Sequence, residues 1–188
     1  MQIRSYDAEK TYITLISDND LILNTVTITD GDFAPDGQPP EARNLDIVVD
    51  SSTITAGIIT VTGTDANNKS IAESFDLADA FTFTSTLNFK TVTNINVSGL
   101  ADEDPGDTIT IGVTDGAQLF EGPGILETVT VNATTGPYTI IDGTTDAGSV
   151  VAIIAGDVPK TFEYHCVIKT GLRVVMAGTG PLTVTWTL

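Results

Sequence analysis

The stretch "ITVTGTDANNKSIAESFDL", Ile59 to Leu77, decides the fold class. Apolar or small residues occupy every second position on both sides of the polar cluster "DANNK", as where Ile59 and Val61 alternate with threonines. A period of two is typical of a strand with one buried face and one wet face, and a cluster of Asp and Asn between two such runs is typical of a turn. The stretch therefore predicts a β-hairpin whose wet face carries mostly threonine and serine.

Similar runs, separated by Gly, Asn, Asp and Pro, recur along all 188 residues, with no convincing amphipathic helix between them. In the last run Leu182, Val184, Trp186 and Leu188 share one face, and threonines occupy the other. Thirty-one threonines suit this pattern, because a β-branched side chain favours an extended backbone and its hydroxyl tolerates water. We therefore predict an all-β protein.

The charge distribution predicts two domains. Residues 1–116 hold 5 basic and 19 acidic groups, a net of -14, whereas residues 117–188 hold 3 and 6, a net of -3. The stretch "FEGPG" follows this change and is typical of a linker. We expect an acidic Ig-like or jelly-roll-like β-sandwich at 1–118, a linker at 119–124 and a small β-sandwich or barrel at 125–188.

The stretch "DFAPDGQPPEARN", residues 32–44, holds three prolines and little apolar content. This composition leaves two interpretations open. We expect a long loop or an extended arm between strands. Such an arm could lie on a neighbouring subunit, and a disordered surface loop is the alternative.

The composition argues against two kinds of partner. The 25 acidic and 8 basic side chains give a net charge of -17, so Coulomb repulsion opposes binding to nucleic acid and to anionic lipid. No apolar run approaches membrane-spanning length, and the charged first residues lack the apolar core of a signal peptide. The single cysteine excludes an intrachain disulfide and fits a reducing cytoplasm, although a cysteine-poor bacterial surface protein would share this property. We expect no nucleic acid and no membrane partner.

His165 and Cys166, the only residues of their types, stand together in "EYHC" and suggest a nucleophile and its base. Adjacent residues of a strand point to opposite faces, however, so these two side chains should not pair. Cys166 shares its parity with Phe162 and Ile168, which predicts a buried and inert thiol. The sequence also lacks a Gly-rich phosphate loop, a zinc ligand set and a convincing Ser-His-Asp set. We therefore predict no catalytic residue and no cofactor.

Acidic loops raise the possibility of calcium, because clustered carboxylates are the ligands that this ion prefers. The candidate residues are Asp18 and Asp20, then Asp30, Asp32 and Asp36, then Asp102, Glu103, Asp104 and Asp107. None of these loops has EF-hand spacing, and Asp, Gly and Pro also build turns for conformational reasons. Solvated turns are the favoured interpretation, so no metal ligand is assigned, and a calcium site is the alternative. Paired carboxylates for glycoside hydrolysis carry little weight among 25 acids.

The words "VTGTDANN", "FKTVTNINVSGL" and "GDTITIGV", within residues 55–115, resemble a module of structural proteins in tailed-bacteriophage virions. The run from "ILETVTVNATTGPYTIIDGTT" to "GLRVVMAGTGPLTVTW" is similar to small β domains of phage head-decorating and other virion proteins. The resemblance implies a non-enzymatic decoration or cement protein that binds and stabilises the phage head. It also implies the major capsid protein or another virion protein as partner, self-association with a trimer as the expected form, and a place on the capsid surface after assembly in the host cytoplasm.

Other functions remain open at this point. A tail, neck or fibre component would use the same modules, and a bacterial adhesin-like module would need an export route. A carbohydrate-binding β-sandwich or small hydrolase would need an aromatic platform, and the only tryptophan, Trp186, has core parity. The threonine faces predict a broad binding surface without a pocket, because short uncharged side chains lose little on desolvation.

Overall fold

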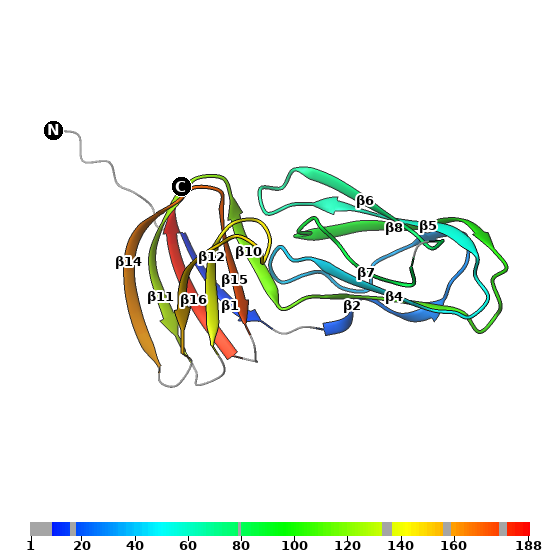
Figure 1. The fold of residues 1–188 in the computed structure, drawn as a ribbon, viewed down its shortest axis with the longest axis horizontal. Coiled ribbons are helices and arrows are strands. Elements are labelled where there is room, and N and C mark those ends of the chain that lie inside the picture. Colours follow the sequence, from blue (N-terminus) through cyan, green and yellow to red (C-terminus); the bar gives the residue numbers. More distant parts are fainter. Residues whose placement is uncertain (1–8, 16–17, 79, 133–136, 156–158, 177–179) are drawn as a thin grey trace. The chain divides into compact units, whose positions relative to one another are not determined.

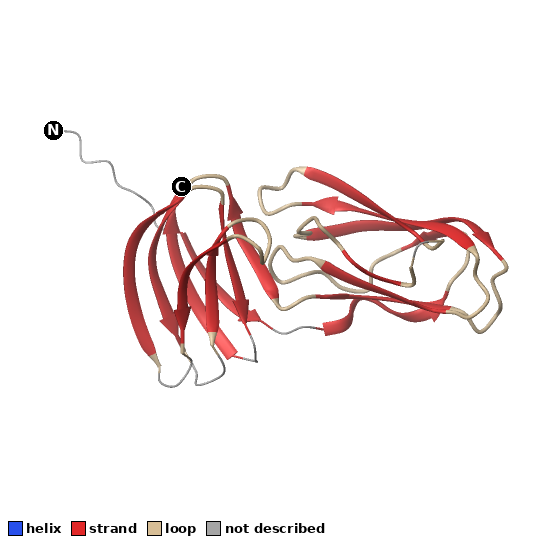
Figure 2. Cartoon of the chain, in the orientation of Figure 1, coloured by secondary structure: helices blue, strands red, loops and turns tan. Residues whose placement is uncertain are grey.

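The computed structural model describes residues 9–15, 18–78, 80–132, 137–155, 159–176 and 180–188. All the regular structure in these residues is β-strand (Figure 2), so the predicted all-β class is confirmed. No helix in the described part of the chain is long and apolar enough to cross a membrane. The strands divide between two compact units, Ser17–Thr114 and Met1–Ile16 with Asp115–Leu188. We call the first the inserted unit and the second the carrier unit.

The inserted unit contains β2 to β9, which form two antiparallel sheets of four strands each. The strands are β2 (Asp18–Thr27), β3 (Gly31–Phe33), β4 (Leu45–Asp50), β5 (Ala56–Thr64), β6 (Ser70–Asp76), β7 (Thr82–Thr84), β8 (Thr91–Ala101) and β9 (Thr108–Val113). One sheet has the order β2-β9-β4-β7 and the other β3-β8-β5-β6. Figure 1 labels β2, β4 and β7 in the first layer and β5, β6 and β8 in the second. The first strand pairs with the last, the second with the seventh, the third with the sixth and the fourth with the fifth. This nested pairing over two sheets is the strand order of an eight-stranded jelly roll.

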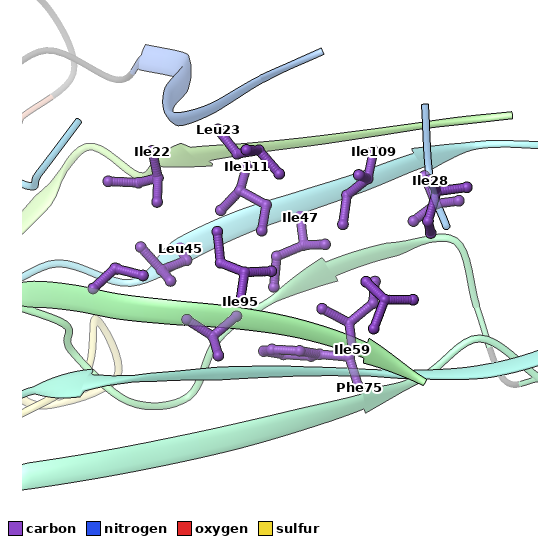
Figure 3. Close-up of a cluster of buried hydrophobic side chains, with 14 of the residues drawn as sticks. Ile22, Leu23, Ile28, Leu45, Ile47, Ile59, Phe75, Ile95, Ile109 and Ile111 are labelled. Atoms are coloured by element: carbon purple, nitrogen blue, oxygen red, sulfur yellow. The ribbon is translucent and has the colours of Figure 1, made fainter. Parts of the chain in front are cut away.

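Alternating side chains from both sheets build the core of the inserted unit. Ile47 and Ile111 come from one sheet and Ile59 and Ile95 from the other, and all four are fully buried. Figure 3 shows these side chains meeting between the two layers of strands. Burying an isoleucine side chain of this size contributes about 1.5–3 kcal/mol relative to leaving it in water. Strand alternation thus places the apolar residues where they hold the two sheets together.

The hairpin predicted from Ile59 to Leu77 is confirmed. Strands β5 and β6 pair in antiparallel register, with Ile59 opposite Phe75. Asp65 closes the turn, because its Oδ1 accepts hydrogen bonds from the backbone N–H groups of Asn67 and Lys69, each at 2.9 Å. Asn68 adopts the left-handed conformation, with φ of 61°, which Asn tolerates better than most residues.

The carrier unit repeats the same strand order. Its strands are β1 (Glu9–Leu15), β10 (Gly116–Glu121), β11 (Gly124–Val131), β12 (Tyr138–Asp142), β13 (Ser149–Ile154), β14 (Lys160–Ile168), β15 (Gly171–Met176) and β16 (Gly180–Thr187). They form the sheets β1-β16-β11-β14 and β10-β15-β12-β13, with the same nesting of first with last strand. Side chains from both sheets, including Val129, Tyr138 and Val184, share one core. The chain therefore forms two jelly rolls, and the first interrupts the second between its first and second strands.

The domain boundaries expected from the sequence are wrong in two respects. Strand β1 pairs with β16, so the residues from Glu9 to Leu15 belong with the C-terminal strands and not with a 1–118 domain. The expected linker at 119–124 is the β10–β11 connection inside the carrier unit, because Phe120 lies in β10 and Gly124 begins β11. A Gly and Pro turn signal marks any connection between strands, and it does not distinguish a domain boundary from a turn. The carrier unit is accordingly larger than the small domain expected at 125–188.

Residues 34–44 connect β3 to β4 as a long loop, and the interpretation of this loop as disordered is wrong. The segment lies against its own unit, and it follows the β3–β8 pairing. The Gln38 Nε2 donates to the Val92 carbonyl at 2.8 Å, and the Val92 N–H donates to the Gln38 Oε1 at 2.7 Å. Further along, Arg43 and Phe89 exchange two backbone hydrogen bonds. Proline has no backbone N–H to donate, so the Gln38 side chain and the backbone of Arg43 hold this segment instead. Composition alone does not reveal these contacts.

Candidate functional site

Hydroxyl groups pair with one another across the outer faces of the sheets. In the inserted unit, Thr60 and Ser74 lie 2.9 Å apart at their hydroxyl oxygens, and Thr64 and Thr91 lie 2.7 Å apart. Thr130 and Thr161 repeat this contact at 2.9 Å in the carrier unit. Cross-strand hydroxyl pairs satisfy each other and add modestly to the stability of a sheet. The predicted threonine faces are therefore real, and many of their hydroxyls already have partners.

His165 and Cys166 point to opposite sides of β14, as predicted. The Nδ1 of His165 lies 2.6 Å from the Glu127 Oε2 on the solvent side. Cys166 packs against the carrier core, where it is half-buried. Burial raises the pKa of the Cys166 thiol, and the charge of Asp142 raises it further, so the reactive thiolate is disfavoured. Within the described residues, the side chain that pairs with His165 is that of Glu127 and not that of Cys166.

The contact with Glu127 depends on a bulge that the sequence did not predict. The register of β11 against β14 shifts between Leu126 and Thr128, opposite Cys166 and Glu163. His165 lies in this irregular segment with a φ of 47°. No local signal in "EYHC" indicates such a bulge, because its position depends on the pairing with a distant strand.

We expect the substitutions His165→Ala and Cys166→Asp to have different effects. His165→Ala removes an exposed side-chain hydrogen bond with Glu127 and changes the free energy of unfolding by less than about 1 kcal/mol. Cys166→Asp places a charge against the carrier core and destabilises by about 2 kcal/mol or more. Urea denaturation of the two variants measures both effects. Rapid alkylation of Cys166 in the native protein would contradict the assignment of this side chain to the core.

The carboxylates of the acidic loops accept hydrogen bonds from their own loops and neighbouring strands. Asp32 accepts from Asn94 and Asn96 at 2.9 and 2.8 Å, and Asp36 accepts from the backbone and side chain of Asn24. Among the residues that the structure describes, no group of three or more His, Cys, Asp or Glu side chains is placed to hold a metal ion. These contacts support the interpretation of the loops as turns built from Asp and Asn.

Asp107 gives this interpretation a pH-dependent test. The Oδ2 of Asp107 accepts a hydrogen bond from the Asp104 N–H at 2.8 Å and another from the Thr53 hydroxyl at 3.0 Å. The Asp104 hydrogen bond lowers the pKa of Asp107 below its usual value of 3.8, burial opposes this, and bonds from Ser51 and Thr53 lower the pKa further. A carboxyl whose folded-state pKa is depressed stabilises the protein above its unfolded-state pKa, and this contribution disappears as the pH falls through the folded-state value.

We therefore expect the stability difference between the wild type and Asp107→Asn to shrink as the pH falls from about 6 to about 2. Urea denaturation of both proteins at a series of pH values measures this difference. If the two stability curves run parallel over the whole range, the Asp107 carboxylate does not hold the loop.

A depression of about 520 Å³ lies on the outer face of the β2-β9-β4-β7 sheet. The depression interrupts a face that we expected to be broad and without a pocket. All four strands contribute to the lining. The lining residues are Asn19, Asp46, Val48, Thr82, Thr84 and Thr110.

Strand alternation and one glycine explain how the depression forms. The residues Ile47 and Val49 of β4 enter the core, so Asp46 and Val48 face outward. Asp46 lies opposite Gly112 of β9, and the backbone of Asp18 and Asn19 occupies the place where a side chain at this position would lie. A Cβ at Gly112 would clash with the backbone of these two residues. The absent side chain therefore lets Asn19 approach β9 closely.

The register of β2 brings Asn19 to this place. Asp18 pairs with Val113, and Leu23 pairs with Ile111. Between these two pairs β2 advances by five residues and β9 by only two, so the register is irregular. The additional residues bend away from regular pairing and carry Asn19 to the rim. Neither the irregular register nor the close approach of two strands leaves a periodic signal in the sequence, so this site was missed.

The comparisons with known proteins identify no relative: no protein-family model, no curated protein and no solved structure matches the chain.

Proposed function

We propose that the chain is a non-enzymatic structural protein of a tailed-bacteriophage virion, and specifically a protein that decorates and stabilises the head. The observation that carries this proposal is the pair of jelly-roll units with hydroxyl-paired outer faces. Such faces can lie against another protein surface at little desolvation cost, and they need no catalytic group. The major capsid protein is the proposed partner, with self-association as a trimer on the shell.

The carrier unit is the part that we assign to attachment. Its share of the -17 net charge is -4, from 5 basic and 9 acidic groups, and the inserted unit's share is -13, from 3 basic and 16 acidic groups. The weaker charge lowers the repulsion between closely packed copies. Strand β13 also exposes Val150 and Ile153, at 57% and 69% of their surface, along the edge of its sheet. An uncharged edge strand with exposed apolar side chains is suited to pairing with another chain.

The strongly acidic inserted unit then serves to keep free copies soluble and apart before assembly. Binding to an intact shell stabilises that shell by mass action, because the ligand prefers the assembled state. Decorated particles should therefore release their genome at a higher temperature than undecorated particles.

Phage particles purified from the strain that expresses this chain provide the test of the decoration role. Purified particles should contain the chain at a copy number that matches many lattice sites, and the purified protein should saturate expanded shells in co-sedimentation. A few copies confined to one vertex or the tail would replace the decoration role with a connector role. Absence from every particle would overturn the virion proposal.

Matched variants locate the attachment surface. Ile153→Glu places a charge on the β13 edge and should reduce shell binding by about tenfold or more, as loss of an interface anchor does. The control is Ile58→Glu, which changes an exposed isoleucine of the inserted unit and should leave shell binding unchanged. Equal effects of the two variants would contradict attachment through β13.

A further inference from the structure

The depression on the β2-β9-β4-β7 sheet combines hydrogen-bonding groups with one apolar contact. Thr82, Thr84 and Thr110 supply hydroxyls, Asn19 an amide and Asp46 a carboxylate, and the exposed Val48 lies among them. None of these lining residues is basic or aromatic. This set offers donors and acceptors together, but no cation that would hold a phosphate or carboxylate.

Neighbouring hydroxyls orient two of the polar groups. The Thr84 hydroxyl donates to the Asp46 Oδ1 at 2.8 Å, and the hydroxyls of Thr25 and Thr110 lie 2.9 Å apart. The other Asp46 oxygen and the side chains of Asn19 and Thr82 receive no hydrogen bond from the described part of the chain. The site therefore contains a held carboxylate with an open oxygen, and an amide and a hydroxyl that are available to a ligand.

We propose that this depression binds a neutral saccharide, with the exposed Val48 in the place of the aromatic platform that we expected of a carbohydrate-binding β-sandwich. Vicinal hydroxyls of a sugar both donate and accept hydrogen bonds, which matches the open Asp46 oxygen, the Asn19 amide and the Thr82 hydroxyl. The C–H face of a sugar ring matches Val48, which lies between Thr82 of β7 and Thr110 of β9 in the pairing register. The -13 charge of the inserted unit repels anionic ligands, so an uncharged polyhydroxylated molecule fits the site best.

The described lining residues do not include the pair of carboxyl groups that cleavage of a saccharide ordinarily requires. Asp46 is the only carboxylate among the described lining residues, and glycoside hydrolysis ordinarily requires two carboxyl groups that face each other across the bond. The inference is therefore one of binding, and it stands whether or not the protein decorates a virion.

Nuclear magnetic resonance titration of the full chain, labelled with nitrogen-15, tests this inference. The probes are the methyl glycosides of glucose, galactose and mannose and free N-acetylglucosamine, at up to about 50 mM, well above millimolar dissociation constants. At least one probe should shift the amide signals of Val48, Thr82 and Thr84 in a saturable way. Glycerol serves as the control for nonspecific hydroxyl contacts.

Two variants separate the site from the rest of the surface. Asp46→Asn should weaken binding about tenfold, because it replaces a charged acceptor, and Thr82→Val should weaken binding through loss of an outward hydroxyl. Thr60→Val, on the opposite sheet of the same unit, is the matched control and should bind as the wild type does. The proposal is overturned if no saccharide shifts these signals, if glycerol shifts them equally, if Asp46→Asn binds unchanged, or if the cation spermidine is the only probe that binds.

Discussion

We expect a fragment of residues 17–114 to fold on its own and to unfold in one cooperative transition. Its described sheet pairings join its own strands, and its core cluster is built from its own side chains. Its two ends are already neighbours, because Asp18 of β2 pairs with Val113 of β9. Excision therefore cuts the chain at two adjacent points and disturbs no strand of the inserted unit.

A fragment of residues 115–188 behaves differently. It lacks β1, so the long edge of β16 loses its partner and the sheet β1-β16-β11-β14 shrinks to three strands. We expect this fragment to aggregate or to show no cooperative transition, since an unpaired edge beside an apolar core promotes association. Joining residues 9–15 to residue 115 through a short Gly-Ser linker should restore cooperative unfolding, because Asp18 and Val113 show that the two attachment points can lie close together.

Circular dichroism with urea denaturation measures the three fragments. A 115–188 fragment as stable as the linked form would show that β1 contributes nothing to the carrier unit. An unfolded 17–114 fragment would show that the inserted unit depends on its carrier.

The second large effect concerns two adjacent isoleucines of β5. Ile59 is 0% exposed in the core of the inserted unit, whereas Ile58 is 44% exposed on the outer face. Ile59→Ala should destabilise the inserted unit by about 2–5 kcal/mol, because it removes buried methylene and methyl groups and leaves a cavity. Ile58→Ala should change stability by about 0.5 kcal/mol, as most exposed substitutions do.

The isolated 17–114 fragment is the appropriate protein for this measurement, since two units in one chain can unfold in separate transitions. Urea denaturation gives both changes relative to the unsubstituted fragment. Similar values for the two variants would contradict the assignment of β5 to one buried and one wet face.

Local alternation explains why part of the structure was predictable. A period of two in the sequence indicates that Ile59, Val61 and Phe75 point into the core. The same alternation predicts that the side chains of His165 and Cys166 point to opposite faces of their strand. Partner choice is not local: β1 pairs with β16, whose sequence lies at the other end of the chain. The period states which side chains are buried, but not which strand lies beside which, so the nested order and the insertion were missed.

The candidate site was unpredictable for a related reason. Asp46 and Val48 have outward parity in the sequence, as do Thr82 and Thr84, but parity does not distinguish a flat face from a hollow one. The hollow depends on Gly112, where the backbone of β2 approaches β9, and on the irregular register that brings Asn19 to the rim. These are properties of strand pairing and not of any single segment.

The insertion between β1 and β10 also determines how the protein would respond to mechanical tension. Glu9 pairs with Trp186, so the two ends of the described chain lie at the same end of the β1–β16 ladder. A force that separates these ends opens that ladder one hydrogen bond after another, starting from Glu9. The inserted unit carries no load until β1 has been peeled away, and its own β2–β9 ladder is then loaded from Asp18 and Val113 in the same way. Under tension the chain would therefore yield in a fixed sequence, carrier first and inserted unit second.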